Sequence, residues 1–587
     1  MRDVIVVGCG GGGPVVAKEL ARWGLDVLVL ESGPRFLHPE KDWSRLENDA
    51  NNPLTGYLRT GPGDRTKAAY TREQPGDEFV WQVSGVGGTT LHYFGNCPRA
   101  SAGVFAGYLG SDAANYDTTH RFPFTLNEFR PYYRWVEATL PVQTAPLGTK
   151  EERFLNGAAA MGLPLCETKE PGEPSFRPQE NAILQPGGTA GKVRNPRFPA
   201  ATGCTFCGHC YQGCVLPVGA PRNLRAKRST DNSYVPMMLT ADAWAAGGRA
   251  AELRTDVHVT RVHTTGWGDS LRASGVTFRD SAGATHREDA KVVVLAAGVV
   301  ETPRLWLISG LPNPNGWVGC GLTDHYPDLV TGVFDDYTGS SKGAGSNARL
   351  DYPGRGGVEN ICLPPALQAF AFTYSDSGTS GVYPGKSGAG SAGADSIGRL
   401  VGPELVDTLS DVDRLLTALV ITDDDVQRSN RVELSWVLPE DGAGRVPRVV
   451  MRHRERSART IANREFLAAQ AVTLMRRAGA RRVHRSDWPP LMLHMHSTMR
   501  MGTDASTSVL DSWSESRVVR RLFIADNSAL PNSLGGPNPT LTTQALATRA
   551  AERILTRYFG GEPWVGQDTP VTSVDDRVTT AVVARGL

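Results

Sequence analysis

The sequence predicts an α/β fold, in which a nucleotide-binding domain with a parallel sheet is interrupted by a second domain built on an antiparallel sheet. Three observations support this prediction. The chain opens with a strand, a helix and a second strand within its first 31 residues. Two apolar runs much further along, Lys291–Gly298 and Arg520–Asp526, are typical of buried parallel strands. The alternating run Arg431–His453 instead predicts two strands around a turn, which indicates an antiparallel sheet.

The first of these units carries a dinucleotide-binding fingerprint. Gly8, Gly10 and Gly13 form G-x-G-x-x-G directly after the strand Val4–Val7 and at the start of the helix, and Glu31 closes the second strand. The first glycine permits a tight turn, the second lets the backbone approach a pyrophosphate, and the third allows close packing of helix on strand. An acid at the position of Glu31 accepts ribose hydroxyls, which argues against NADP but does not separate FAD from NAD.

The length and charge of the chain narrow the class of protein. Its 587 residues exceed the roughly 250–300 at which single cores stop growing, so either several ordinary domains or one large discontinuous assembly is expected. With 40% hydrophobic and 21% charged residues, the composition is that of a soluble globular protein. The chain has 62 basic and 61 acidic side chains, so it lacks the excess of positive charge that is typical of nucleic-acid-binding proteins. We therefore expect a small-molecule or protein partner.

The beginning of the chain bears on its location. MRDVIVVGCG enters an apolar strand without a basic leader or a small-residue cleavage site, so no secretory signal is expected. No stretch approaches the roughly 18 uncharged apolar residues of a membrane span. We expect a cytoplasmic protein, and in that reducing compartment clustered cysteines are more often metal ligands or redox thiols than disulfides.

Four of the nine cysteines fall within eleven residues, as C-x2-C-x2-C-x3-C. This is the spacing of bacterial ferredoxin runs, and it predicts an iron–sulfur cluster, with a thiol-rich loop without metal as an almost equal alternative. Zinc is the weakest interpretation, because no second cysteine pair follows at the usual interval. The four are Cys204, Cys207, Cys210 and Cys214. The basic residues that follow are expected to form a solvated face, or else to offset the charge of a cluster: Arg222, Arg225, Lys227 and Arg228.

The carboxyl-terminal part carries the most specific motifs. HMHSTMRMGTD (His494–Asp504) and the long run Arg520–Ile554, together with VSGVGGTTLHYFGN (Val83–Asn96) and AAGVVETPRLWLISG (Ala296–Gly310), resemble the glucose–methanol–choline (GMC) family of FAD-dependent alcohol oxidoreductases. Within it, the chain looks like members of the His/Asn type, near gluconate-dehydrogenase-like and long-chain alcohol oxidase proteins. The resemblance is much weaker between these blocks. It implies a Rossmann-like FAD-binding domain with a discontinuous substrate domain.

The resemblance also suggests domain boundaries. The FAD-binding domain is expected to comprise residues 1–100, 200–330 and 490–560, and the substrate-binding domain with its cap and loops residues 101–199 and 331–489, followed by a tail over 561–587. A Gly/Ser-rich tract, Ser375–Gly398, is interpreted either as a mobile surface loop or lid, or as flexible filler.

A catalytic pair is implied by the same resemblance. The family's catalytic histidine falls on His494 and its partner on Asn538, 44 residues later, while Ser497 replaces a usual glycine. Oxidation of a CH–OH group needs a base that titrates near neutrality, and histidine suits that role. An asparagine can hold the same oxygen without competing for the proton. His496 is the rival base, because in an extended HMH both rings point to one face.

Five further residues are implied to contact the cofactor. Gly87 and Gly88 match a second flavin-contacting loop, and His92 falls where some relatives attach the flavin covalently, although a non-covalent contact is favoured here. Asp526 matches an acid near the ribityl–pyrophosphate, and Val259 a residue whose backbone meets the adenine.

The predicted function is therefore oxidation of a primary or secondary alcohol, such as a sugar, sterol or long-chain alcohol, by hydride transfer to FAD. The electrons go to oxygen or to another acceptor, and a cluster would favour the second. The alternatives are a non-redox family member such as a lyase, and an iron–sulfur electron carrier or redox sensor.

Overall fold

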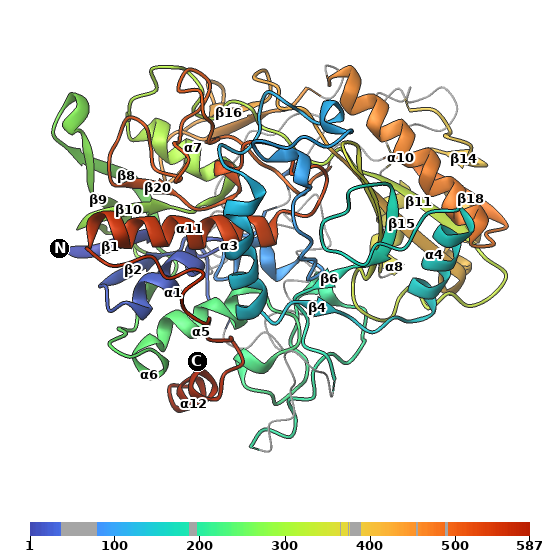
Figure 1. Cartoon of the computed structure of the whole chain (residues 1–587), viewed down its shortest axis with the longest axis horizontal. Helices are drawn as coiled ribbons and strands as arrows, with labels where there is room; N and C mark the ends of the chain where they lie inside the picture. The colour runs from blue at the N-terminus through green and yellow to red at the C-terminus, as the bar shows by residue number, and fades with distance from the viewer. Residues whose placement is uncertain are drawn as a thin grey trace.

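The computed structural model describes residues 1–36, 79–80, 82–186, 197–363, 365–373, 375, 389–452, 456–487 and 491–587. Two seven-stranded sheets dominate it. In Figure 1 the first lies on the left, with both chain termini, and the second lies on the right beneath α10 (Ala458–Arg477). Of the Gly/Ser-rich tract, residues 376–388 lie outside the described residues.

The first sheet contains the predicted strand–helix–strand unit. Its order is β7-β2-β1-β10-β9-β8, and β20 pairs with β10. The pairs that β1 makes with β2 and β10, and that β10 makes with β20, are parallel, whereas β9 pairs antiparallel with β8 and β10. Every residue of β2 and β20 is buried, as is typical of parallel strands covered on both faces. The bounds are β1 (Arg2–Val7), β2 (Val27–Leu30), β7 (Glu252–Arg254), β8 (His258–Thr265), β9 (Arg272–Arg279), β10 (Thr285–Leu295) and β20 (Leu522–Ile524).

Helices enclose this sheet. The first, α1 (Gly13–Arg22), joins β1 to β2 and packs against α5 (Tyr234–Leu239) and α11 (Thr540–Tyr558). Pro14 stands in its first turn, where a missing N–H leaves no helical hydrogen bond unmade. Helix α7 (Gly298–Ile308) lies within the block Ala296–Gly310 and packs against β8. The other helices of this half are α3 (Leu126–Thr139), α6 (Ala241–Trp244) and α12 (Asp576–Ala584).

The second sheet is antiparallel except at one edge. Its order is β14-β18-β11-β15-β13-β12-β5, and only β14 runs parallel to its neighbour among these described pairs. Helix α10 packs across β11, β15 and β18 and buries their apolar residues. The predicted fold class is thus confirmed. The strands are β5 (Ser175–Pro178), β11 (Asp328–Val333), β12 (Ala348–Tyr352), β13 (Gly356–Ile361), β14 (Ser396–Ile397), β15 (Leu415–Thr422) and β18 (Arg482–Ser486), and the neighbouring helices α4 (Thr149–Ala160), α8 (Pro365–Thr373) and α9 (Gly402–Ser410).

The hairpin predicted over residues 431–453 is not part of the second seven-stranded sheet. Strands β16 (Arg431–Leu434) and β17 (Pro447–Val450) pair antiparallel as expected, but they form a sheet of their own. Val432 and Val449 pack on Val299 and Val300 of α7, so the hairpin belongs beside the first sheet. His453, at the end of that run, lies outside the described residues. Two small pairs complete the fold, namely β3 (Phe79–Val80) with β19 (Leu491–Met492), and β4 (Gln143–Thr144) with β6 (Glu180–Asn181).

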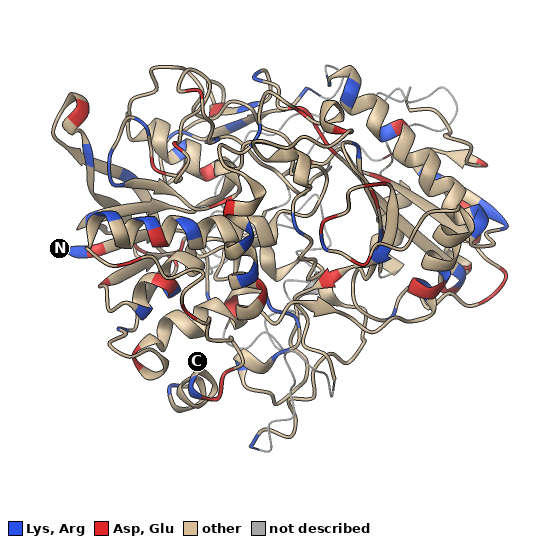
Figure 2. Cartoon of the chain, viewed as in Figure 1, with Lys and Arg blue, Asp and Glu red and all other residues tan. Residues whose placement is uncertain are grey.

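Charges of both signs are interspersed over the molecule. Basic and acidic side chains both lie along α10 and α11, where a single Glu accompanies several Arg (Figure 2). This distribution agrees with the net charge of +1. Among the helices of the described chain, none combines the length and the apolar character that a membrane crossing requires.

Candidate active site

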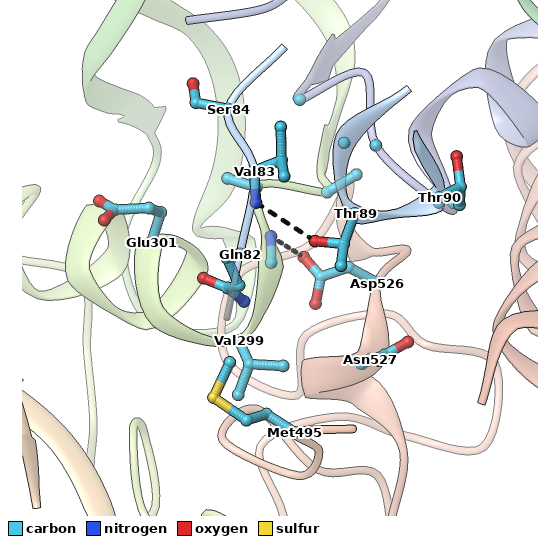
Figure 3. Close-up of a pocket in the computed structure, with 18 of the residues that line it drawn as sticks. Gln82, Val83, Ser84, Thr89, Thr90, Val299, Glu301, Met495, Asp526 and Asn527 are labelled. Atoms are coloured by element: carbon cyan, nitrogen blue, oxygen red, sulfur yellow. Dashed lines mark hydrogen bonds between the residues drawn. The ribbon is translucent and has the colours of Figure 1, made fainter. Parts of the chain in front are cut away.

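One cavity, of about 290 Å³, brings together most of the residues that the sequence singles out. Its lining comes from both halves of the molecule, with Leu30 contributed by the first sheet and Leu419 by the second. In Figure 3, Thr89, Thr90, Asp526 and Asn527 surround part of this space. The predicted residues that line it are Gly8, Gly10, Glu31, Gly88, His92, Val259, His494, Asp526 and Asn538. Gly13, Gly87 and the four clustered cysteines are not part of the lining.

The glycine fingerprint forms a backbone cradle at one end of the cavity. Gly8 has a φ of +101°, and a Cβ there would lie 2.3 Å from the Ala296 carbonyl oxygen. A Cβ on Gly13 would lie 2.1 Å from the carbonyl oxygen of Gly8, so helix and strand approach too closely for any side chain. At Gly10 the nearest protein atom would be 3.9 Å away. The protein itself therefore leaves room at Gly10, where a pyrophosphate can approach the backbone and the start of α1.

Glu31 follows β2 at the same end. Its carboxylate accepts hydrogen bonds of 2.8 Å from the backbone N–H groups of Cys9 and Gly33, which fixes it beside the glycine loop. Burial raises the pKa of Glu31, while these two bonds act in the opposite direction. Val259, on β8, lines the cavity near this end, and Cys9 is a fully buried residue within the loop.

The second glycine loop packs against the first. Gly87 has a φ of +107° and donates its N–H to the carbonyl of Cys9 at 2.8 Å. A Cβ on Gly88 would lie 2.7 Å from the Cα of Gly10, so the two loops touch through their backbones. This contact joins the cradle to the segment that carries His92.

His92 and Asp526 occupy fixed positions along the cavity. His92 donates from Nδ1 to the carbonyl oxygen of Tyr211 at 2.9 Å, and burial lowers its pKa to about 3, with Lys227 adding to the effect. Asp526 accepts from the N–H of Gly298 at 3.0 Å, a bond drawn in Figure 3, and from the hydroxyl of Thr302 at 2.7 Å. These partners hold both side chains beside the cavity before any ligand binds.

His494 and Asn538 meet at another part of the cavity. His494 follows β19, Asn538 precedes α11, and 3.5 Å separates His494 Nε2 from Asn538 Nδ2. Removal from bulk water lowers the pKa of His494 to about 4, so at neutral pH its ring is uncharged. Within the described structure, Asn538 Oδ1 is buried and has no hydrogen-bond partner. The pair thus presents an uncharged imidazole and an amide oxygen without a partner to the cavity.

His496 does not share this position. Its ring is fully buried and does not line the cavity, and neither ring nitrogen has a partner in the part of the chain that the structure describes. His494 lies in a bend and His496 forms a β-bridge with Thr323, yet both rings pack on the same neighbour, His325, with centroids 4.9 Å and 5.2 Å away. The two rings thus share a neighbour, but only His494 reaches the cavity.

Sequence comparison assigns the family. The family model described as GMC oxidoreductase matches the chain in an N-terminal part, over residues 10–327, and in a C-terminal part, over residues 407–547. The chain belongs to the GMC oxidoreductase family. The resemblance drawn from the sequence motifs is thereby confirmed.

Curated relatives and solved structures agree with this assignment. The GMC oxidoreductase is 29% identical to paromamine 6'-oxidase of Streptomyces fradiae, covering 94% of this chain and 91% of the relative. It is 27% identical to 2-methyl-1,2-propanediol dehydrogenase of Mycolicibacterium austroafricanum, covering 95% of each. A formate oxidase variant of Aspergillus oryzae has the same fold, with a TM-score of 0.59 at 15% identity over 95% of this chain and 99% of that one.

Two residues beside His494 and Asn538 of this GMC oxidoreductase were missed by the sequence motifs. His325 places Nδ1 2.9 Å from His494 Nδ1. Glu359, on β13, accepts from the side-chain amide of Asn96 at 3.0 Å and from that of Asn538 at 3.5 Å. No motif singled out either residue, because both act on partners more than 160 residues away in the sequence. In the sequence, the adjacent acid and histidine Asp324–His325 could have drawn attention to His325.

The described structure does not bring the cysteine run together as a metal site. All four thiols are free, and no group of three or more His, Cys, Asp or Glu side chains in the described residues could hold a metal ion. Burial raises the pKa of Cys204 to about 12 and that of Cys210 to about 11. The arrangement does not fit the predicted iron–sulfur cluster, and we derive no step through one. Within the run, Gly208 and Gly213 have positive φ, which glycine adopts without strain.

The expectation of a solvated basic face after this run is wrong. Arg222, Lys227 and Arg228 are buried, and only Arg225 is partly exposed. Lys227 donates to the carbonyls of Leu91 and Tyr93 at 2.8 Å and of Cys210 at 2.5 Å. Backbone carbonyls thus compensate the buried ammonium group, and they tie the cysteine segment to the loop that carries His92.

Proposed function

We propose that this GMC oxidoreductase oxidises the CH–OH group of a small-molecule alcohol with FAD as its cofactor and His494 as the base. The observation that carries the proposal is the pairing of His494 with Asn538, at 3.5 Å, in the same cavity as the glycine cradle. A base beside a dinucleotide site suits a reaction in which a proton and a hydride leave one substrate.

The residues around the cavity fit a dinucleotide. Gly10 would approach the pyrophosphate, Glu31 would take ribose hydroxyls, and Asp526 would lie near the sugar-alcohol part of the cofactor. When bound, FAD supplies the acceptor for a hydride. The name of one solved relative, which refers to FAD modification, supports FAD over NAD.

His494 and Asn538 would act directly on the substrate. The uncharged Nε2 of His494 can take the hydroxyl proton, and the lowered pKa keeps it available down to about pH 4. The free Oδ1 of Asn538 can accept a hydrogen bond from the substrate, while its Nδ2 is directed at His494 and Glu359. Asn538 would thus orient the alcohol without taking its proton.

The class of substrate is supported by the relatives, whose names describe an oxidase of paromamine and a dehydrogenase of 2-methyl-1,2-propanediol. Both compounds carry alcohol groups. One relative is named an oxidase and the other a dehydrogenase, so the electron acceptor has to be determined by assay.

Absorbance spectroscopy tests this proposal. The purified protein should show a flavin spectrum, and anaerobic addition of a suitable alcohol from a panel of aminoglycosides, diols, sugars, sterols and long-chain alcohols should bleach it. Oxygen and an artificial acceptor, added separately, then identify the acceptor. A bound flavin that no alcohol bleaches would instead point to a lyase or a redox sensor and would overturn the proposal.

A further inference from the structure

The imidazole of His325 contacts His494 but does not line the cavity. Its Nδ1 lies 2.9 Å from Nδ1 of His494, and its Nε2 lies 2.8 Å from the carbonyl oxygen of Ser533. The side chain is 2% exposed. Both ring nitrogens of His325 are therefore engaged in hydrogen bonds within the protein.

These contacts allow one consistent arrangement of protons on two neutral rings. A carbonyl oxygen only accepts, so Nε2 of His325 must carry the proton of that ring. A neutral imidazole has one N–H, which leaves Nδ1 of His325 as an acceptor. Nδ1 of His494 must then be the donor. Because its single proton is used there, Nε2 of His494 is bare.

The surroundings keep both rings neutral. Burial lowers the pKa of His494 to about 4 and that of His325 far below its ordinary value, where the adjacent His494 and His496 and the cation of Arg349 add to the effect. The nearby carboxyl group, Asp324, accepts from the backbone N–H groups of His325, Leu493 and His494, so it bonds the chain and not the rings.

We propose that His325 is a positioning residue that selects the tautomer of His494 with its proton on Nδ1 and with a bare Nε2 facing the cavity. This inference rests on the proposed role of His494 as the base. Nε2 is the nitrogen nearest Asn538, so it is the one directed at the substrate. When the O–H bond of the alcohol breaks, the proton bonds to Nε2 and the electron pair stays on oxygen. The opposite tautomer would present an N–H there and could not accept.

The same contacts explain why the proton would stay on His494. Once Nε2 is protonated, the ring is charged, and its Nδ1–H bond to His325 becomes a stronger, charge-assisted one. The other nitrogen of His325 already donates to a carbonyl group, so His325 has no acceptor to which it could pass a proton onward. His325 thus orients and stabilises the base without acting as a relay.

Histidine-selective ¹⁵N NMR tests the tautomer without any substrate. In the FAD-bound protein at neutral pH, the His494 signals, assigned by their loss in His494→Gln, should report a protonated Nδ1 and a bare Nε2. A proton on Nε2 would overturn the proposal. This measurement decides the tautomer even if no alcohol is found that reduces the flavin, so it is separable from the proposed function.

Two substitutions of His325 then test its effect on the rate. His325→Leu removes the acceptor, so the rate of anaerobic flavin reduction should fall by about 10- to 100-fold, part of what a positioned base contributes, with little change in KM. His325→Asn puts an oxygen acceptor near the position of Nδ1 and should restore most of the rate. His484→Asn, at a buried histidine on β18, is the matched control and should leave the rate unchanged.

Flavin content and thermal stability are measured for each variant, so that misfolding is recognised. A folded, FAD-bound His325→Leu with the wild-type rate would overturn the proposal. So would a His325→Asn variant that is folded and FAD-bound but no faster than His325→Leu. If His325→Leu does not fold, the NMR spectrum of the wild type and the rate of flavin reduction in His325→Asn still test the proposal.

Discussion

At the scale of single residues, the three glycines of the fingerprint are glycine for different reasons. Gly8 and Gly13 are required by the protein, since a Cβ on either would lie within 2.3 Å of a backbone oxygen. Gly10 is not, because its nearest neighbour would be 3.9 Å away. The structure therefore distinguishes two positions at which the folded chain needs glycine from one at which it does not, and we expect a bound cofactor to need the space at Gly10.

This difference predicts opposite results for two alanine variants. Gly13→Ala should destabilise the protein itself by about 1–3 kcal/mol, because the methyl group forces helix and strand apart. Gly10→Ala should leave the Tm of the apoprotein unchanged but weaken FAD binding by about 10- to 100-fold. Thermal unfolding of the apoproteins and titration with FAD measure both effects. An unstable Gly10→Ala apoprotein would contradict this assignment.

Single residues also mark the limit of prediction from the sequence. The fingerprint glycines and Glu31 could be singled out because their expected roles depend on local spacing within one strand–helix–strand unit. His325 and Glu359 were not found, because their partners His494 and Asn538 lie 169 and 179 residues away. The burial of Lys227 was missed for a related reason, since a run of basic residues resembles a surface until the carbonyls around it are known.

At the scale of elements, the position of His494 depends on two segments that run beside each other. Thr323 and His496 form an antiparallel bridge between them. Asp324 adds a clamp, because its Oδ1 accepts from the N–H groups of His325 at 2.8 Å and His494 at 2.7 Å, and its Oδ2 accepts from that of Leu493 at 3.1 Å. One side chain thus fixes the backbone of both histidines.

Removing this clamp should cost stability in proportion to the bonds lost. Asp324→Ala leaves one buried and two part-buried N–H groups without this acceptor, which should destabilise the protein by about 2–3 kcal/mol. Asp324→Asn keeps the oxygen that serves two of them and should cost about 1–2 kcal/mol. Thermal unfolding compares the two variants. Equal losses for both would show that the clamp does not act through these bonds.

At the scale of the whole molecule, the cavity lies where the two sheets both contribute, and the sequence predicted these halves unequally. The first sheet was predicted from apolar runs and turn glycines, which indicate strands and turns from the local sequence alone. The second sheet was anticipated from the run 431–453, but that hairpin packs on α7 and the seven-stranded sheet is built from other strands. Its strands carry buried charges such as Asp328, Arg349 and Glu359, which hide the apolar pattern.

The pairing of His494 with a cofactor site is the central claim, and one rate tests it most directly. Anaerobic reduction of the bound flavin by a reactive alcohol is followed in a stopped-flow instrument for the wild type, for His494→Ala and for the matched buried-histidine control His484→Ala. Loss of the base should lower the rate by about 10²- to 10⁴-fold in His494→Ala while FAD stays bound, and the control should keep the wild-type rate. Wild-type reduction by a folded, FAD-bound His494→Ala would contradict the account.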